Sequence, residues 1–200
     1  MRLRRGGIPS IAAAAVVALL IGPSADPLAK SGGRCEIQGR VITADSAAVI
    51  YRKGDPVVLT NIFVCVQKNG TTRKLGYHEP GYGGVSSFNL AGKYVAYIRR
   101  FCYESGPCVG EPHTRNVVSN KDRRGSPTPG PAFDVRPLAF PSGSLAWIRR
   151  KESTNEVHTL DTAGEHVVDA GPAVDPTSLA RSGHTLYWTH DGEPRSAQVP

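Results

Sequence analysis

Histidine and aspartate occur together at two places where short strand-like segments end. His158 lies three residues before Asp161, and His190 directly precedes Asp191. An imidazole beside a carboxylate can bind a cation or a sugar. The six histidines form no HExxH motif and no His-x-His pair, and no serine has the spacing of a nucleophile elbow. We therefore expect no metal and no cofactor, and we name His158 and His190 as candidate binding residues, with ordinary strand-end and turn positions as the competing interpretation.

Two arginine pairs, Arg99-Arg100 and Arg149-Arg150, follow nearly identical apolar phrases. A guanidinium group offers a planar, bidentate fork that suits phosphate or carboxylate. Arginine also keeps exposed strand ends soluble, so the pairs predict either an anion-binding edge or a solvated one. The segment that contains Tyr77, His78 and Tyr82 is compatible with carbohydrate or peptide contact and equally with packing between sheets.

The four cysteines are an even number, which in an exported chain indicates two disulfides. Cys102 and Cys108 are separated by a turn-rich stretch that can bring its ends together, which favours local pairing and leaves Cys35 to pair with Cys65. A zinc site made of Cys102, Cys108 and His113 is the alternative. The five-residue spacing and the lack of an evident fourth ligand argue against it.

A repeated phrase organises the chain. AYIRR at residues 96–100 returns as AWIRR at 146–150, with looser copies in LYWTH at 186–190 and AVIYRKGD at 48–55. When the copies are aligned on their aromatic residues (Tyr51, Tyr97, Trp147 and Trp188), the spacings range from 41 to 50 residues. Strand-rich repeats of about 40 to 50 residues are typical of propeller blades.

The residues around the phrase favour an all-β protein. Tyr94 to Ile98 is apolar at five consecutive positions, so both faces of this strand must be covered, as they are when sheets stack on one another. Asp191-Gly192 between two strand-like runs predicts a tight hairpin. The proline- and glycine-rich stretch 121–132 predicts a loop or short linker between two blades, with a boundary between two independent domains as the alternative. The expected fold is a β-propeller-like array of three to four small antiparallel blades, open or incomplete.

The phrases SGHTLYWTHDGEPRSA, residues 182–197, and GKYVAY, residues 92–97, resemble exported bacterial β-propellers of the TolB-like and WD40-like kind. The resemblance covers roughly residues 35–200 and implies an architecture rather than a chemistry. Propellers of that kind usually close with about six or more blades, whereas this length holds four at most. A four-bladed ring, an open arc and an array completed by another chain, including a homo-oligomer, all fit. In a ring, residues 40–44 would supply the strand that the last blade lacks.

The N-terminus has the layout of a secretory signal peptide. Three arginines within the first five residues precede an apolar run at 11–21 and then small residues. This run is shorter than the roughly 20 residues that a membrane-spanning helix needs, so we expect export without a stable membrane span. The predicted domains are a signal peptide at 1–25, with cleavage as late as 29, a short linker at 26–34 and the β-propeller-like domain at 35–200. The expected location is secreted, periplasmic or in the cell envelope.

The net charge of +7 falls to +4 once the three N-terminal arginines are removed. This modest charge does not indicate nucleic-acid binding. The sequence therefore favours an exported, non-catalytic binding or scaffold protein whose partner is an envelope or extracellular protein or an anionic cell-surface polymer. The alternative is an extracellular, carbohydrate-active hydrolase or lyase with its site at the blade ends, because a glycosidase needs only two suitably spaced carboxylates.

Overall fold

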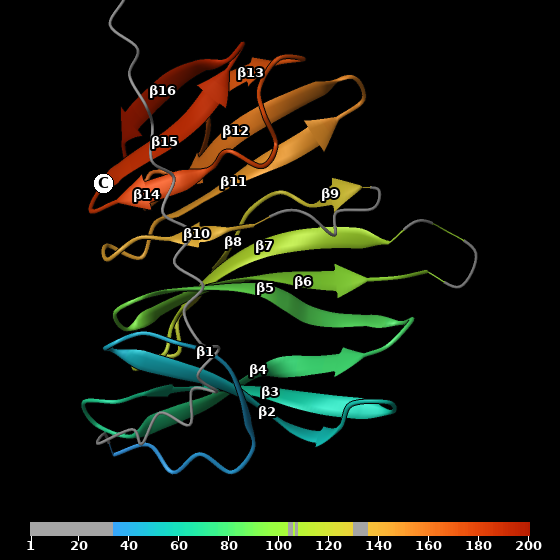
Figure 1. Cartoon of the computed structure of the whole chain (residues 1–200), viewed down its shortest axis with the longest axis vertical. Helices are drawn as coiled ribbons and strands as arrows, with labels where there is room; N and C mark the ends of the chain where they lie inside the picture. Colours follow the sequence, from blue (N-terminus) through green and yellow to red (C-terminus); the bar gives the residue numbers. More distant parts are fainter. Residues whose placement is uncertain (1–33, 104–105, 107, 130–135) are drawn as a thin grey trace, which may run out of the picture. The chain divides into compact units, whose positions relative to one another are not determined.

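Strands make up all the regular structure in the residues that the computed structural model describes, which are 34–103, 106, 108–129 and 136–200 (Figure 1). This part of the chain contains no helix long and apolar enough to span a membrane. The predicted signal peptide at 1–25 and the predicted linker at 26–34, apart from Arg34, lie outside the described residues.

The strands form four antiparallel groups, here called blades, in which neighbours in sequence are neighbours in the sheet. The first blade contains β1 (Arg40–Ala44), β2 (Ala48–Asp55), β3 (Leu59–Val66) and β4 (Thr71–Glu79). The second contains β5 (Gly83–Ala91), β6 (Tyr94–Phe101), β7 (Val109–Asn116) and β8 (Asp122–Arg124), with the short β9 (Thr128–Pro129) also paired with β7. The third contains β10 (Leu138–Ala139), β11 (Leu145–Lys151), β12 (Thr154–Leu160) and β13 (Glu165–Gly171). The fourth contains β14 (Ala180–Ser182), β15 (Thr185–His190) and β16 (Glu193–Gln198).

The four aligned aromatic residues lie on the second strand of each blade: Tyr51 on β2, Tyr97 on β6, Trp147 on β11 and Trp188 on β15. The first two blades are continuous, because β4 and β5 pair at their connecting turn. The predicted fold class is therefore confirmed: the described chain is an open, propeller-like array of small antiparallel blades.

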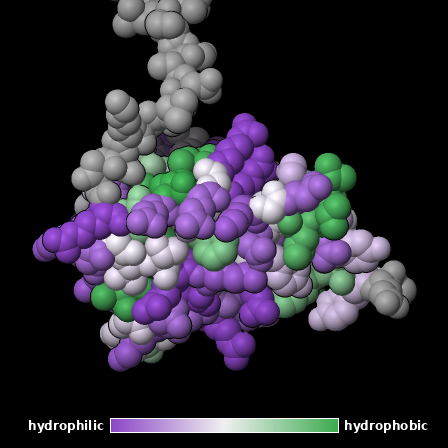
Figure 2. Space-filling view, turned by 90° about the horizontal axis from the view of Figure 1, so that it is seen from below, coloured by the Kyte–Doolittle hydropathy of each residue, from purple (hydrophilic) through white to green (hydrophobic). Residues whose placement is uncertain are grey.

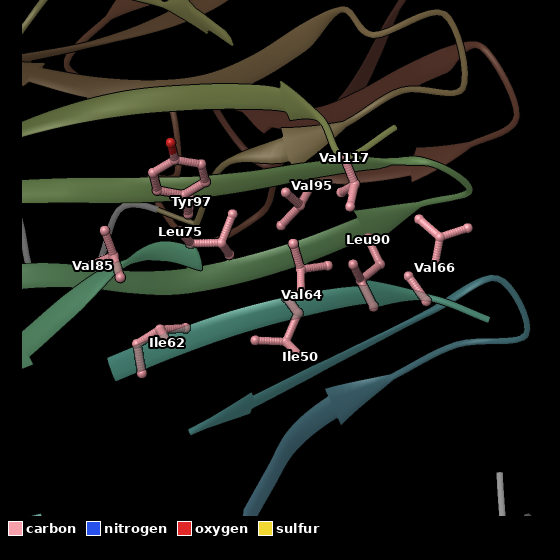
Figure 3. Close-up of a cluster of buried hydrophobic side chains, with 11 residues drawn as sticks. Ile50, Ile62, Val64, Val66, Leu75, Val85, Leu90, Val95, Tyr97 and Val117 are labelled. Carbon is pink, nitrogen blue, oxygen red and sulfur yellow. The ribbon is translucent and has the colours of Figure 1, made fainter. Parts of the chain in front are cut away.

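A separate apolar core lies between each pair of successive blades. The core between the first and second blades contains Ile50 and Val64 from one side and Val95 and Tyr97 from the other (Figure 3). The next core joins Ala96 of β6 to Trp147 of β11, and the last joins the third blade to Trp188. Strand β6 thus has Val95 and Tyr97 on one buried face and Ala96 on the other, which explains its unbroken apolar run.

The fourth blade has three strands, and residues 40–44 do not complete it. These residues form β1, which pairs with β2 at the edge of the first blade. The expectation that they close the ring is therefore wrong. The turn between β1 and β2 is short: the Asp45 carboxylate accepts backbone hydrogen bonds from Ala47 and Ala48 at 2.8 Å each, which holds the two strands as a local hairpin.

The stretch 121–132 contains more strand than its prolines predict, because β8 and β9 both fall within it. Strand β8 pairs with β7 at His113 to Arg115, and β9 pairs with β7 at Val109 and Gly110. Pro112 lies in the gap between these two pairings, where no strand needs a backbone N–H from it. Its carbonyl oxygen still accepts a hydrogen bond from Gly125 at 2.9 Å. Residues 130–132 lie outside the described residues.

Both predicted disulfides are confirmed: Cys35–Cys65 and Cys102–Cys108. The first ties residues 34–39, here called the N-terminal strap, to β3. Cys35 and Ile37 of the strap pack against Tyr51 and Phe63. The strap therefore covers the face of the first blade that, in the other blades, packs against the preceding blade.

Candidate functional site

The second blade holds a buried histidine between two carboxylates. His113 of β7 stacks on the Tyr97 ring of β6, with the ring centroids 5.1 Å apart. Its Nδ1 lies 2.8 Å from Asp122 Oδ2, and its Nε2 lies 2.7 Å from Glu111 Oε2. Glu111 reaches the ring because residues two apart on a strand share a face. Both ring nitrogens are therefore occupied by this blade's own side chains.

The third blade repeats this arrangement with different residues. His158 of β12 stacks on Trp147 of β11, also at 5.1 Å between centroids. Its Nε2 lies 3.0 Å from Glu156 Oε2 and its Nδ1 lies 2.8 Å from Glu165 Oε1. Arg149 donates to the same Glu156 oxygen from Nε at 3.1 Å and from Nη2 at 2.6 Å. His158 is only 1% exposed, so it is a packed component of the blade rather than a group that faces solvent.

These contacts change the ionisation of the acids and of the tyrosine. Hydrogen bonds from Arg149 and from His158 lower the pKa of Glu156. Burial opposes ionisation of Asp122, but the hydrogen bond and charge of His113, together with Arg115, bring its pKa below the ordinary value. Burial, reinforced by the negative charge of Asp122, raises the pKa of Tyr97. The acids are therefore stabilised as anions by their histidine and arginine partners.

His190 has a carboxylate partner, although not the neighbouring Asp191. Its Nδ1 lies 2.9 Å from Oδ2 of Asp169 on β13, and the Trp188 indole donates to the same oxygen at 2.6 Å. Burial alone would raise the pKa of Asp169. The two hydrogen bonds outweigh this effect, and the pKa lies below its ordinary value. Asp191 instead lies in the β15–β16 turn. Its φ is 55° and that of Gly192 is 75°, as the predicted tight hairpin requires.

The candidate residues named from the sequence do not form one group. His158 lies on the third strand of its blade, whereas His190 ends the second strand of another. Arg149 joins His158 through Glu156, and Arg150 is exposed. The Arg99 guanidinium instead lies over the Phe101 ring, 4.8 Å from the ring centroid. Glu111 lies opposite Arg99 in the β6–β7 register, as Glu156 lies opposite Arg149 in the β11–β12 register. Arg100 precedes Phe101 at the end of β6.

A hollow of about 550 Å³, here called the β1–β5 groove, opens between the first blade and β5. Three basic side chains line it: Arg40, Arg52 and His78. Hydroxyl groups of Thr43, Thr60, Ser86 and Ser87 also line it, together with apolar residues of β1, β3 and β5. The two arginines come from paired strands, because Arg40 lies directly opposite Arg52 in the β1–β2 register.

The basic groups of this groove have no acidic partner. No aspartate or glutamate lines it, and within the described residues neither guanidinium group nor the His78 ring forms a hydrogen bond or an ion pair. The wall formed by β5 is also irregular. The β5–β6 register shifts between Ser86 and Asn89, and Ser87 has a φ of 55°, a left-handed conformation that is uncommon for serine. Bulges and backbone strain of this kind occur often beside binding sites.

The sequence carries a signal for two of these features. Glu-x-His occurs at the same place in two blades, as Glu111-Pro112-His113 and as Glu156-Val157-His158, and the strand period places both side chains on one face. Arg40 and Arg52 lie opposite each other once a short hairpin joins the expected strand at 40–44 to the phrase AVIYRKGD. The position of His78 beside them depends on tertiary packing alone.

Within the described residues, no group of three or more histidine, cysteine, aspartate or glutamate side chains could hold a metal ion. No protein-family model and no curated protein matches the sequence. Among solved structures, the chain is similar to the β-propeller domain of the Trilobed protease from Pyrococcus furiosus, which is described as having an open velcro topology. The sequence identity is 14% and the TM-score is 0.44, and the match covers 76% of this chain and 54% of that one. The chain thus spans about half of that structure.

Proposed function

We propose that this protein is an exported, non-catalytic binding protein that receives an anionic group of an envelope partner or surface polymer in the β1–β5 groove. The observation that carries the proposal is the set of three basic side chains, Arg40, Arg52 and His78, which line one hollow and have no acidic partner among the described residues. Two arginines that face each other across a strand pair can hold phosphate or carboxylate oxygens through bidentate hydrogen bonds.

The acidic residues support binding rather than hydrolysis. A glycosidase needs two carboxylates that face one hollow and flank the scissile bond. Here the acid pairs Glu111 with Asp122 and Glu156 with Glu165 each flank a histidine ring instead. None of these four carboxylates lines the β1–β5 groove.

Export also has support in the structure. Two disulfides are present in the described chain, and disulfides persist in oxidising compartments. Together with the N-terminal pattern of a signal peptide, they favour a location outside the cytoplasm, where anionic envelope polymers are accessible partners.

The test is calorimetric titration of the oxidised protein with inorganic polyphosphate as a soluble model polyanion. We expect salt-sensitive binding that weakens at least about 30-fold in the Arg40→Gln, Arg52→Gln double variant, since each lost charge contact is worth roughly 1 to 2 kcal/mol. The control is Lys68→Gln with Arg195→Gln, which removes the same charge from two exposed sites outside the groove. Equal weakening in both double variants would contradict a site in the groove.

A further inference from the structure

Exposed apolar side chains concentrate at the end of the first two blades where β2 turns into β3 and β4 turns into β5. Val57 is 79% exposed and Val58 is 65% exposed in the first of these turns, and Tyr82 is 72% exposed in the second. Phe101, at the end of β6, is 40% exposed. We call these four residues the turn rim. Large apolar groups gathered at one place on a surface mark an interaction site more often than isolated ones do.

The hydrogen-bonded register places the parts of the rim side by side. Leu59, next to Val58, begins β3, and Thr60 pairs with His78 of β4. The turn that holds Tyr82 leads into Gly83, which pairs with Phe101. Neighbouring strands lie about 4.8 Å apart, so the rim is one continuous edge. In Figure 1 these turns lie on the right-hand side of the first two blades, and one of the hydrophobic patches in Figure 2 lies on the same side.

Basic side chains frame the same edge. Arg40 and Arg52 of the β1–β5 groove lie toward this end of β1 and β2, and Lys53 follows on β2. Arg99 covers Phe101 and is itself exposed. Two acids are nearby, but the Asp55 carboxylate accepts a backbone hydrogen bond from Val57 at 2.7 Å and so shapes the turn. The other, Glu79, is only half-buried at the end of β4.

We propose that the turn rim and the β1–β5 groove together dock the protein on an anionic membrane surface. This rests on the proposed function, because the groove supplies the anion site and the rim identifies the anion as a lipid headgroup. Valine and tyrosine side chains enter the boundary between headgroups and acyl chains, while the arginines contact lipid phosphates. One such attraction alone gives weak binding, whereas an apolar contact combined with a basic patch gives a stable one. The contact is peripheral, and no part of the described chain needs to cross the bilayer.

The experiment is vesicle flotation of the oxidised protein. The vesicles contain phosphatidylcholine alone or phosphatidylcholine mixed with phosphatidylglycerol. We expect flotation only with the anionic mixture, and loss of it at about 1 M salt, where the Debye length is ~3 Å. Val57→Asp with Val58→Asp should weaken the interaction at least about tenfold. The control is Val167→Asp with Val168→Asp, two exposed valines on β13 that should leave flotation unchanged.

The outcomes separate this proposal from the proposed function. Polyphosphate binding of each variant is measured in parallel and also shows that the variant is folded. Polyphosphate binding without flotation on anionic vesicles would overturn the membrane proposal and leave the groove intact. Equal flotation on both vesicle types, or equal loss in the two valine variants, would also overturn it. Capture of the chain by an envelope protein through the rim, with no vesicle binding, would do the same.

Discussion

At the scale of single residues, His113 and His158 are buried inside blades, whereas Arg40, Arg52 and His78 line a hollow. His113 and His158 are each stacked on an aromatic ring, and a carboxylate oxygen lies within 3.0 Å of each of their ring nitrogens. Within the part of the chain that the structure describes, Arg40, Arg52 and His78 have no such partners, and they line a hollow. A buried group whose hydrogen bonds are complete stabilises the fold, whereas an unpaired cation at a hollow is available to a ligand.

The lowered pKa values of Asp122, Glu156 and Asp169 predict acid sensitivity. A carboxyl group whose pKa is depressed in the folded state contributes stability above its unfolded value, about 4, and this contribution is lost as the pH falls through the folded pKa. We therefore expect the free energy of unfolding to decline as the pH falls below about 4. Urea unfolding at a series of pH values measures this decline.

The matched variants for this prediction are Glu156→Gln and Glu193→Gln. Glu156→Gln removes an acid that Arg149 and His158 hold as an anion, and should reduce the slope of stability against pH. Glu193 is exposed in the last hairpin, so Glu193→Gln should retain the slope of the unmodified chain. A slope that is the same in all three proteins would show that the carboxylate–histidine contacts do not contribute.

At the scale of the elements, the repeated phrase predicted most of the strands, and packing decided the others. The phrase AVIYRKGD forms β2, and the run beginning at Tyr94 forms β6. Most of β7 was missed, because Gly110 and Pro112 are unfavourable in a strand and only the gap between β8 and β9 makes the proline acceptable. The groove could not be predicted from strand patterns, since it depends on how the first blade meets the bulge at Ser87.

Gly125 gives a test of how the second blade meets the third. A Cβ at this position would lie 2.4 Å from one carbon of the Trp147 ring and 2.7 Å from another. Because Trp147 is fully buried, the ring has little room to move. We expect Gly125→Ala to destabilise the protein by about 1 to 3 kcal/mol, measured by urea unfolding.

A second substitution makes the cause of that loss specific. In a Trp147→Phe background the smaller ring removes the contact, so adding Gly125→Ala should cost much less than it does in the unmodified chain. A double-mutant cycle measures the difference. An equal cost in the two backgrounds would show that the glycine is needed for its backbone rather than for the indole.

At the scale of the described array, the two outer faces differ from the internal ones. The first blade covers its outer face with the disulfide-linked strap. On the fourth blade, Tyr187 is 42% exposed at the position where Ile50, Ala96 and Ala146 are fully buried against a following blade. Terminal units of repeat arrays commonly have an outer face suited to solvent. The sequence had left open a four-bladed ring, an open arc and an array completed by another chain, and the described blades form an open array.

The central claim is that the β1–β5 groove is the binding site, and amide NMR mapping tests it most directly. Titration of the isotope-labelled, oxidised chain with short polyphosphate should shift the amide signals of His78, Ser86, Ser87 and Phe88, which line the groove. The signals of Arg149 and Arg150 on the third blade should remain in place. Shifts confined to the ends of β6 and β11, with the groove signals unchanged, would contradict the account and favour the paired arginines as the site.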